Sequence, residues 1–142
     1  MMEISGHTLV DKVRCFMLYQ YAKSVSCMSG DVAEIGVYKG GTARLLARTL
    51  QPSEKKIHLF DTFSGMPATD NVKDYHRKGD FGDTCMEKVS ELLKDCSNVL
   101  FYQGLFPDTA KPVAEKSFCL VHVYVDIYRS VIDCCEFFYP RL

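Results

Sequence analysis

The chain has 142 residues, of which 47% are hydrophobic and 25% charged, a balance that predicts one globular domain and excludes disordered and collagen-like chains. Its formal net charge of −1 gives no basic surface for nucleic acid or anionic membranes, so neither is an expected partner. The longest apolar run, residues 118–125, is far shorter than the about 20 residues that span a bilayer. No secretory signal is visible at the start, so the chain is expected to be cytoplasmic.

Helical and extended patterns alternate along the chain. An apolar period near 3.6 residues predicts an amphipathic helix that ends before Gly30, and the residues that recur in it are Leu9, Val13, Phe16, Met17, Tyr21 and Val25. Strands are predicted at residues 32–37, 57–63, 99–102 and 118–126. Further helices are predicted at residues 42–50, 84–93 and 130–139, with a short polar helix between the last two strands. Residues 64–82 lack periodicity, which predicts a long functional loop that is mobile without ligand.

Strands that alternate with helices, and that are apolar on both faces, predict an α/β fold with an open parallel sheet and right-handed crossovers. Ligands of such sheets bind beyond the carboxyl ends of the strands. The candidate ligand-binding segments are therefore residues 34–42 and 61–65, together with Gly104 and Asp126.

The first segment carries glycines in the pattern G-x-x-x-G-G from Gly36 to Gly41. Glycine allows a ligand to approach the backbone closely and permits positive φ angles. The spacing differs from the dinucleotide fingerprint G-x-G-x-x-G, which disfavours a nicotinamide cofactor and favours a ligand without phosphate. A tight strand-to-helix connection without a ligand is the alternative.

Asp61 ends the second predicted strand. An acidic side chain at this place in such folds accepts hydrogen bonds from the hydroxyls of a ribose, so a nucleoside ligand is expected. The alternative is that Asp61 caps the following turn together with Thr62 and Ser64.

Four segments in the same order resemble the macrocin O-methyltransferase (TylF) family, namely residues 30–41, 60–67, 79–84 and 104–109. The resemblance implies a Rossmann-like class I methyltransferase fold that uses S-adenosyl-L-methionine to methylate a sugar hydroxyl of a small-molecule natural product. It also implies that residues 1–142 are one incomplete domain that lacks the last strands, with an N-terminal helix in 1–29 and the Rossmann-like part in 30–142.

The resemblance further assigns cofactor-binding residues. Residues 34–40 would line the methionine and ribose end of the cofactor, and residues 61–65 would hold the ribose and flank the adenine. The assigned set is Glu34, Gly36, Val37, Tyr38, Gly40, Asp61, Thr62, Phe63, Ser64 and Gly65.

Two departures from the family concern magnesium, which the family uses together with carboxylates. The first aspartate of the family's His-Ile-Asp-x-Asp-x-Tyr motif is Tyr124 here, and a neutral phenol is a poor magnesium ligand. The family's next two aspartates come after the point where this sequence ends. Asp126 remains, as a general base or as a helix cap, and no metal ligand is predicted.

Two functions remain open: a methyltransferase with an incomplete metal site, or a degenerate or truncated homologue that binds S-adenosylmethionine without catalysis. The outer edge of the strand at 118–126 is expected to be open and to favour a second copy or a partner chain. His58 and His122 are expected to be hydrogen-bonded core histidines. The polar run that contains His76 is expected to be a solvated part of the loop, with contact to an acidic substrate as the alternative.

Overall fold

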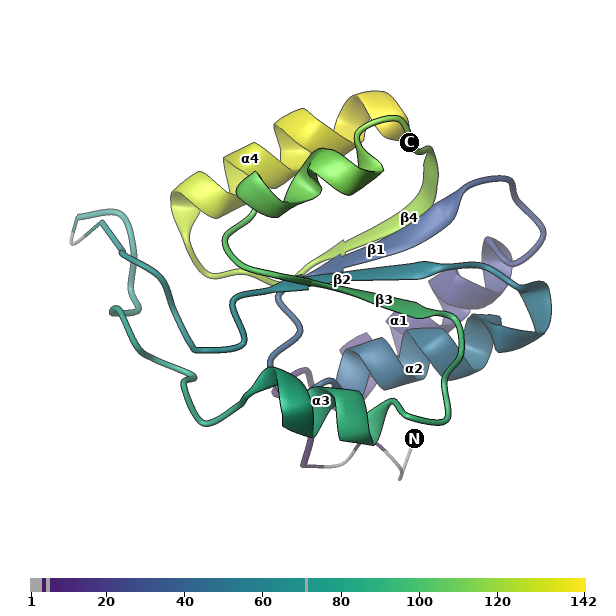
Figure 1. The fold of residues 1–142 in the computed structure, drawn as a ribbon, viewed down its shortest axis with the longest axis horizontal. Helices are drawn as coiled ribbons and strands as arrows, with labels where there is room; N and C mark the ends of the chain where they lie inside the picture. Colours follow the sequence, from purple (N-terminus) through teal and green to yellow (C-terminus); the bar gives the residue numbers. More distant parts are fainter. Residues whose placement is uncertain (1–3, 5, 71) are drawn as a thin grey trace.

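The structure is a computed structural model that describes residues 4, 6–70 and 72–142, and within them four strands form one parallel sheet (Figure 1). The strands are β1 (Asp31–Ile35), β2 (Ile57–Asp61), β3 (Val99–Gln103) and β4 (Phe118–Val123). Their order is β3-β2-β1-β4. Ile35 pairs with both Phe60 and Val123, so the carboxyl ends of the three strands β2, β1 and β4 lie level. The predicted open parallel sheet is confirmed.

Helices cover both faces of this sheet (Figure 1). The α-helices are α1 (Lys12–Ser24), α2 (Gly41–Leu50), α3 (Met86–Leu92) and α4 (Tyr128–Phe138). Short 3-10 helices are η2 (Gln51–Ser53), η3 (Asp108–Val113) and η4 (Tyr139–Arg141). Each predicted helix is present, and its ends agree with the prediction to within a few residues. No helix of the described residues is long and apolar enough to cross a membrane.

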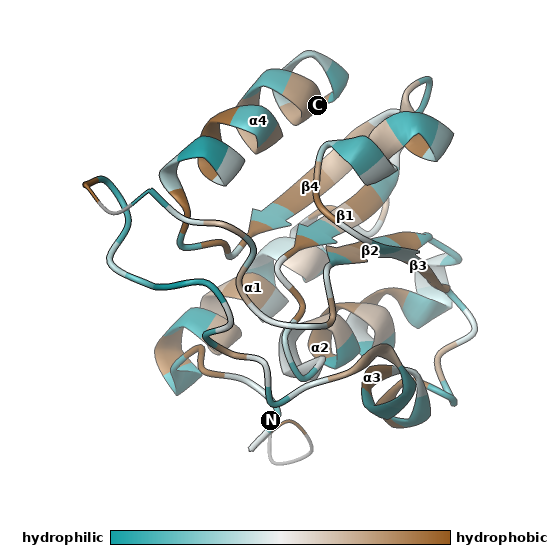
Figure 2. Cartoon of the chain, turned by 60° about the vertical axis from the view of Figure 1, so that its left-hand side comes forward, coloured by the Kyte–Doolittle hydropathy of each residue, from teal (hydrophilic) through white to brown (hydrophobic). Residues whose placement is uncertain are grey.

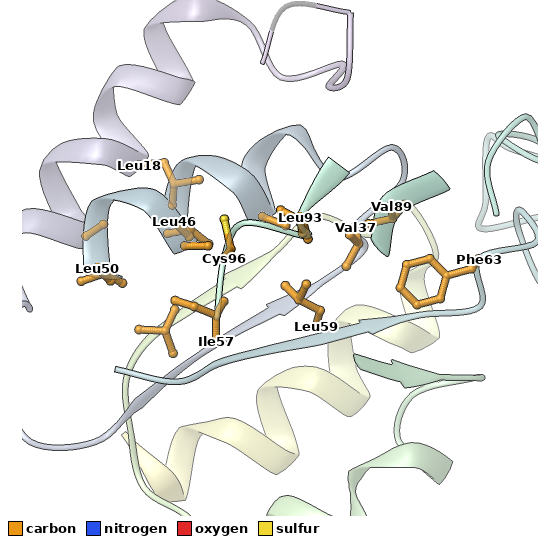
Figure 3. Packing of buried hydrophobic residues seen from close by; sticks show 14 residues of the cluster. Leu18, Val37, Leu46, Leu50, Ile57, Leu59, Phe63, Val89, Leu93 and Cys96 are labelled. Atoms are coloured by element: carbon orange, nitrogen blue, oxygen red, sulfur yellow. The ribbon is translucent and has the colours of Figure 1, made fainter. Parts of the chain in front are cut away.

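The face covered by α1, α2 and α3 holds a cluster of buried aliphatic side chains (Figure 3). Leu46 of α2 points toward Ile57 and Leu59 of β2, and Leu18 reaches the same cluster from α1 (Figure 3). Each buried leucine or isoleucine contributes about 1.5–3 kcal/mol through the area that it removes from water. This layer therefore fixes α2, and with it the turn that follows β1.

The opposite face, under α4 and η3, is built from aromatic rings. The Phe60 ring lies edge-on to Phe106 with 5.4 Å between centroids, and Phe118 packs edge-on against Phe138 of α4 at 5.0 Å. Edge-to-face pairs of this kind stabilise beyond the area that they bury. They hold α4 so that its first residue lies beside the carboxyl end of β4.

The position of α1 agrees with its prediction, but most of the apolar residues that predicted it are exposed. Val13 is 72% exposed, and Phe16, Met17 and Tyr21 are also exposed. The buried face of α1 is formed by a second stripe with helical spacing, which consists of Cys15, Leu18 and Ala22. Both stripes repeat every three or four residues, so the period alone gives the helix and not the face that is buried.

Candidate functional site

A pocket of about 260 Å³ lies at the carboxyl ends of β1, β2 and β4. The chain builds β2 and β3 on one side of β1 and β4 on the other, and in open α/β sheets ligands bind at this switch point. The walls are mostly apolar. The polar and titratable side chains among them include Asp61, Thr62, His76, Tyr124, Asp126 and Ser130.

Half of the predicted cofactor-binding residues line this pocket. They are Gly36, Tyr38, Asp61, Thr62 and Gly65, and Asp126 lines the pocket with them. The topology brings these residues together because the segments after β1, β2 and β4 all leave the sheet at its carboxyl end.

The other predicted residues lie outside the pocket walls. Glu34 is fully buried, and its Oε1 lies 2.8 Å from Nδ1 of His122, its partner on β4. Val37 and Phe63 belong to the buried, mostly aliphatic cluster of Figure 3. Gly40 packs against Val89, and Ser64 is exposed; neither lines the pocket.

Asp61 is held by backbone N–H groups from two turns. Its Oδ2 accepts the N–H of Val37 at 2.6 Å and that of Tyr38 at 2.9 Å, while its Oδ1 accepts the N–H of Phe63 at 2.8 Å. The Thr62 hydroxyl donates to the Gly65 carbonyl at 2.7 Å, which completes the second turn. The turn-capping geometry is thus present. Oδ1 keeps one acceptor position, since its further contact with the Thr62 hydroxyl is long, at 3.5 Å.

The turn after β1 holds strained backbone at the pocket. A side chain at Gly36 would clash with the carbonyl oxygen of Tyr124, so glycine is required there by the neighbouring chain itself. Tyr38 has a φ of 54°, which is costly for a residue with a side chain. Besides Asp61, the Thr84 hydroxyl holds this residue by donating to the Tyr38 carbonyl at 2.8 Å.

The N-terminus of α2 does not offer its first N–H group to a phosphate. The Gly41 N–H donates to the carbonyl of His7 at 2.9 Å, and a side chain at Gly41 would meet the same carbonyl oxygen at 2.7 Å. Phosphates in related folds bind to such free N–H groups. That the ligand has no phosphate stays a prediction.

One ion pair and one hydrogen bond join the turn after β1 to Asp83, the residue that follows the long loop. Lys39 Nζ lies 2.5 Å from Asp83, and the Tyr38 hydroxyl lies 3.2 Å from the same carboxylate. The hydrogen bonds from Lys39 and then Tyr38 lower the pKa of Asp83 below its ordinary value. Asp83 therefore stays ionised and keeps the loop end beside the pocket.

The long loop, residues 64–82, is mostly hydrophilic (Figure 2), yet it contacts the pocket and α4. Its two arms pair where the Met66 N–H donates to the Asp80 carbonyl at 2.8 Å. Asp74 accepts the N–H of Tyr128, the first residue of α4, at 2.8 Å. His76 lines the pocket, so the prediction of a solvated run is wrong for this residue, whereas Lys73, Arg77 and Lys78 of the same run are exposed as predicted. No spacing in the sequence signals this, because the contact is made by the fold.

The carboxylates of the pocket do not form a magnesium site. In the described part of the chain no three His, Cys, Asp or Glu side chains gather as metal ligands. Asp61 already accepts three backbone N–H groups, and Tyr124 stacks on the His122 ring at 6.0 Å between centroids. Asp126 is the one pocket carboxylate with both oxygens free of hydrogen bonds from described residues. Magnesium prefers several oxygen ligands, so these donors do not fit it.

Comparison with known proteins gives one family for nearly the whole chain. The family described as Macrocin-O-methyltransferase (TylF) matches residues 3–142. The 8-demethyl-8-(2,3-dimethoxy-alpha-L-rhamnosyl)-tetracenomycin-C 4'-O-methyltransferase of Streptomyces olivaceus is 27% identical over 155 residues. Demethyldecarbamoylnovobiocin O-methyltransferase of Streptomyces niveus is 23% identical over 154 residues. The matches cover 96% and 97% of this chain but 59% of each relative, so the chain spans about three fifths of their length.

Solved structures share the fold. The O-methyltransferase NovP superposes with a TM-score of 0.82 at 24% identity, over 95% of this chain and 62% of NovP. The calicheamicin methyltransferase CalS11 gives a TM-score of 0.78 at 19% identity, over 92% of this chain and 60% of CalS11. The chain thus has the Rossmann-like fold of these methyltransferases.

Proposed function

The chain belongs to the macrocin O-methyltransferase (TylF) family, and on that premise we propose that its pocket binds S-adenosylmethionine for transfer of a methyl group to a hydroxyl. The observation that carries the proposal is the meeting of Gly36, Asp61 and Asp126 in one pocket at the switch point of the sheet. A family resemblance alone gives a fold, whereas this arrangement gives a site.

The residues present fit a nucleoside without a phosphate better than a phosphate-bearing cofactor. The free acceptor position of Asp61 Oδ1 suits a ribose hydroxyl, and Phe60 and Leu105 belong to an apolar wall that can bury a base. The Gly41 N–H is taken by His7. S-adenosylmethionine meets these conditions and supplies an electrophilic methyl group when bound.

Asp126 is the candidate proton acceptor. It lines the pocket just after β4, and its carboxylate is 46% exposed, so it can release a proton to solvent after accepting one. A base with this access raises the nucleophilicity of a hydroxyl, and positioning supplies much of the remaining rate. Residues 66 and 81 of the loop also line the pocket, where they exclude water from the reacting groups.

We propose a sugar hydroxyl of a small-molecule natural product as the methyl acceptor. The support is the two curated relatives, which are named as O-methyltransferases of a rhamnosyl-tetracenomycin and of a novobiocin precursor. Because the chain spans about three fifths of those relatives, this substrate class comes to the chain as a proposal. We also propose that residues 1–142 act as one domain, since α1 shares the core cluster of α2, and that a second copy or partner chain covers the outer edge of β4.

The second candidate function is cofactor binding without catalysis. This candidate is favoured by the pocket side chains, which do not fit magnesium, because the family's chemistry uses that metal. The two candidates agree on the cofactor and differ on turnover, so one titration and one transfer assay separate them.

Isothermal titration with S-adenosylhomocysteine tests the shared part of the proposal. We expect binding to the wild-type chain and at least about tenfold weaker binding by Leu105→Trp, since an indole there fills the pocket. Leu100→Trp is the matched control, because Leu100 has similar exposure and lies outside the pocket. A folded wild-type chain that releases no heat at millimolar ligand would overturn the proposal.

A further inference from the structure

His76 and Asp126 face each other at the pocket from two different segments. The imidazole comes from the loop at residues 64–82, and the carboxylate follows β4. Nε2 of His76 lies 4.0 Å from Oδ2 of Asp126, and both residues line the pocket. Within the described residues, this imidazole is the only ion-pair partner of the Asp126 carboxylate.

The His76 ring is held in this orientation by its surroundings. Its Nδ1 lies 3.5 Å from the Asp80 carboxylate, and its edge packs on the Phe81 ring with 4.9 Å between centroids. The same loop is tied to α4 where Asp74 accepts the Tyr128 N–H at 2.8 Å. The side chain is 28% exposed, so most of the ring is removed from water. These contacts leave Nε2 as the ring nitrogen that faces Asp126.

The gap between the two side chains matches one oxygen atom. A distance of 4.0 Å is too long for a direct hydrogen bond, whose N···O separation is about 2.7–3.2 Å. One oxygen can instead lie about 2.8 Å from both atoms at once. A hydroxyl suits this place, since it can donate its hydrogen to the Asp126 carboxylate while it accepts the Nε2–H of a His76 ring that is protonated at Nε2. A phosphate or carboxylate oxygen would have no hydrogen for Asp126.

We propose that His76 and Asp126 together bind the methyl-accepting hydroxyl, and that His76 is a further catalytic residue of the site. The inference rests on the proposed function and deepens it. The hydroxyl proton passes to Asp126, the freed oxygen lone pair forms the bond to the methyl carbon, and the carbon–sulfur bond breaks with its electron pair going to sulfur. His76 holds the oxygen from the other side and so aligns it for this attack.

The test uses the chain saturated with S-adenosylhomocysteine and methyl α-L-rhamnopyranoside as the hydroxyl probe. Nitrogen-15 spectra of labelled imidazoles give a readout that does not depend on turnover. We expect the Nε2 resonance of His76 to move with the glycoside, while those of the other three histidines stay fixed. His76→Phe should lower the affinity for the glycoside about tenfold, which is the effect of losing one good hydrogen bond. It should leave the affinity for S-adenosylhomocysteine within about twofold of the wild type.

Two variants sharpen this result. His76→Gln keeps an N–H donor on a side chain of similar reach, so it should restore part of the affinity that His76→Phe loses. Arg77→Gln is the matched control in the same loop, because Arg77 lies outside the pocket and should bind like the wild type.

The outcomes separate this inference from the function on which it rests. No binding of S-adenosylhomocysteine by the wild type overturns the proposed function. S-adenosylhomocysteine can bind while the glycoside does not bind, or while the glycoside binds equally well to the wild type and to His76→Phe. In either case the hydroxyl site formed by His76 and Asp126 is wrong and the proposed cofactor site stands. A fixed Nε2 resonance at saturating glycoside also overturns it.

Discussion

The Asp61 carboxylate accepts the backbone N–H of Tyr38 at 2.9 Å, and so joins the end of β2 to the strained turn after β1. The same oxygen accepts the N–H of Val37, and the other oxygen accepts that of Phe63. Asp61 therefore shapes the pocket before any ligand arrives. A ribose hydroxyl would add to these bonds at Oδ1 and would not replace them.

Asp61→Ala should lower the free energy of unfolding and should also weaken the binding of S-adenosylhomocysteine. The substitution leaves three partly buried N–H groups without an acceptor, which costs roughly 2–4 kcal/mol in total. Urea unfolding followed by circular dichroism measures this loss. Asp108→Asn is the control, since Asp108 is exposed and accepts no hydrogen bond from described residues. An Asp61→Ala chain with wild-type stability but weakened ligand binding would instead support a role toward the ribose alone.

The two faces of α1 give a second prediction, on stability alone. Phe16→Ser and Met17→Ser should each lower the free energy of unfolding by only about 1 kcal/mol, because Phe16 is 46% and Met17 45% exposed. Leu18→Ala should cost about 2–5 kcal/mol, because Leu18 is buried against α2 (Figure 3). Equal losses at Phe16 and Leu18 in the same urea series would show that another surface covers the outer face of α1.

These two cases show what the sequence could and could not predict. The parallel sheet follows from apolar strands that alternate with helices, and Asp61 follows from its place after β2. The buried face of α1 depends on whether α2 receives Leu18 or Phe16, which no local pattern contains. The pairing of His76 with Asp126 likewise depends on how an aperiodic loop crosses the strand ends.

Buried His58 predicts a dependence of stability on pH. Burial lowers the pKa of His58, against the opposing effect of the Asp31 carboxylate, whose Oδ2 lies 2.9 Å from Nε2. In the unfolded chain a histidine has a pKa of about 6.5, so the unfolded chain binds the proton more readily than the folded chain. The contribution of His58 to the free energy of unfolding should therefore be complete above that pH, and the free energy of unfolding should fall as the pH drops below it.

The His58 prediction is checked by urea unfolding at pH values from neutral to mildly acidic. His58→Gln should flatten the pH dependence, and His7→Gln, at an exposed histidine, should leave it as in the wild type. Identical slopes in the wild type and His58→Gln would refute the assignment to His58.

The contact between Asp74 and Tyr128 predicts how the loop at residues 64–82 behaves. The backbone hydrogen bond from Tyr128 lowers the pKa of Asp74, so the contact persists above the ordinary aspartate pKa and weakens as the pH falls below it. Asp74→Ala should raise hydrogen exchange at the Tyr128 amide several-fold, while Glu136→Ala, at an exposed residue of α4, should not. That the loop is mobile without ligand stays a prediction, and equal loop protection with and without S-adenosylhomocysteine would count against a lid.

The last prediction is that magnesium does not support methyl transfer by this chain. Asp61 is occupied by backbone N–H groups, and Tyr124 stands where the resemblance places the first metal-binding aspartate. Among the described residues the pocket therefore offers one free carboxylate, that of Asp126. Magnesium gives up its water reluctantly and binds a lone carboxylate weakly. Millimolar magnesium or a chelator should therefore leave both S-adenosylhomocysteine affinity and any transfer to a sugar hydroxyl unchanged. Tyr124→Asp adds one ligand and should raise magnesium affinity only slightly, whereas transfer that rises with magnesium and stops with chelator would mean that ligands come from a partner chain. Transfer that needs no metal and is abolished by Asp126→Asn would establish Asp126 as the base and remove the non-catalytic alternative.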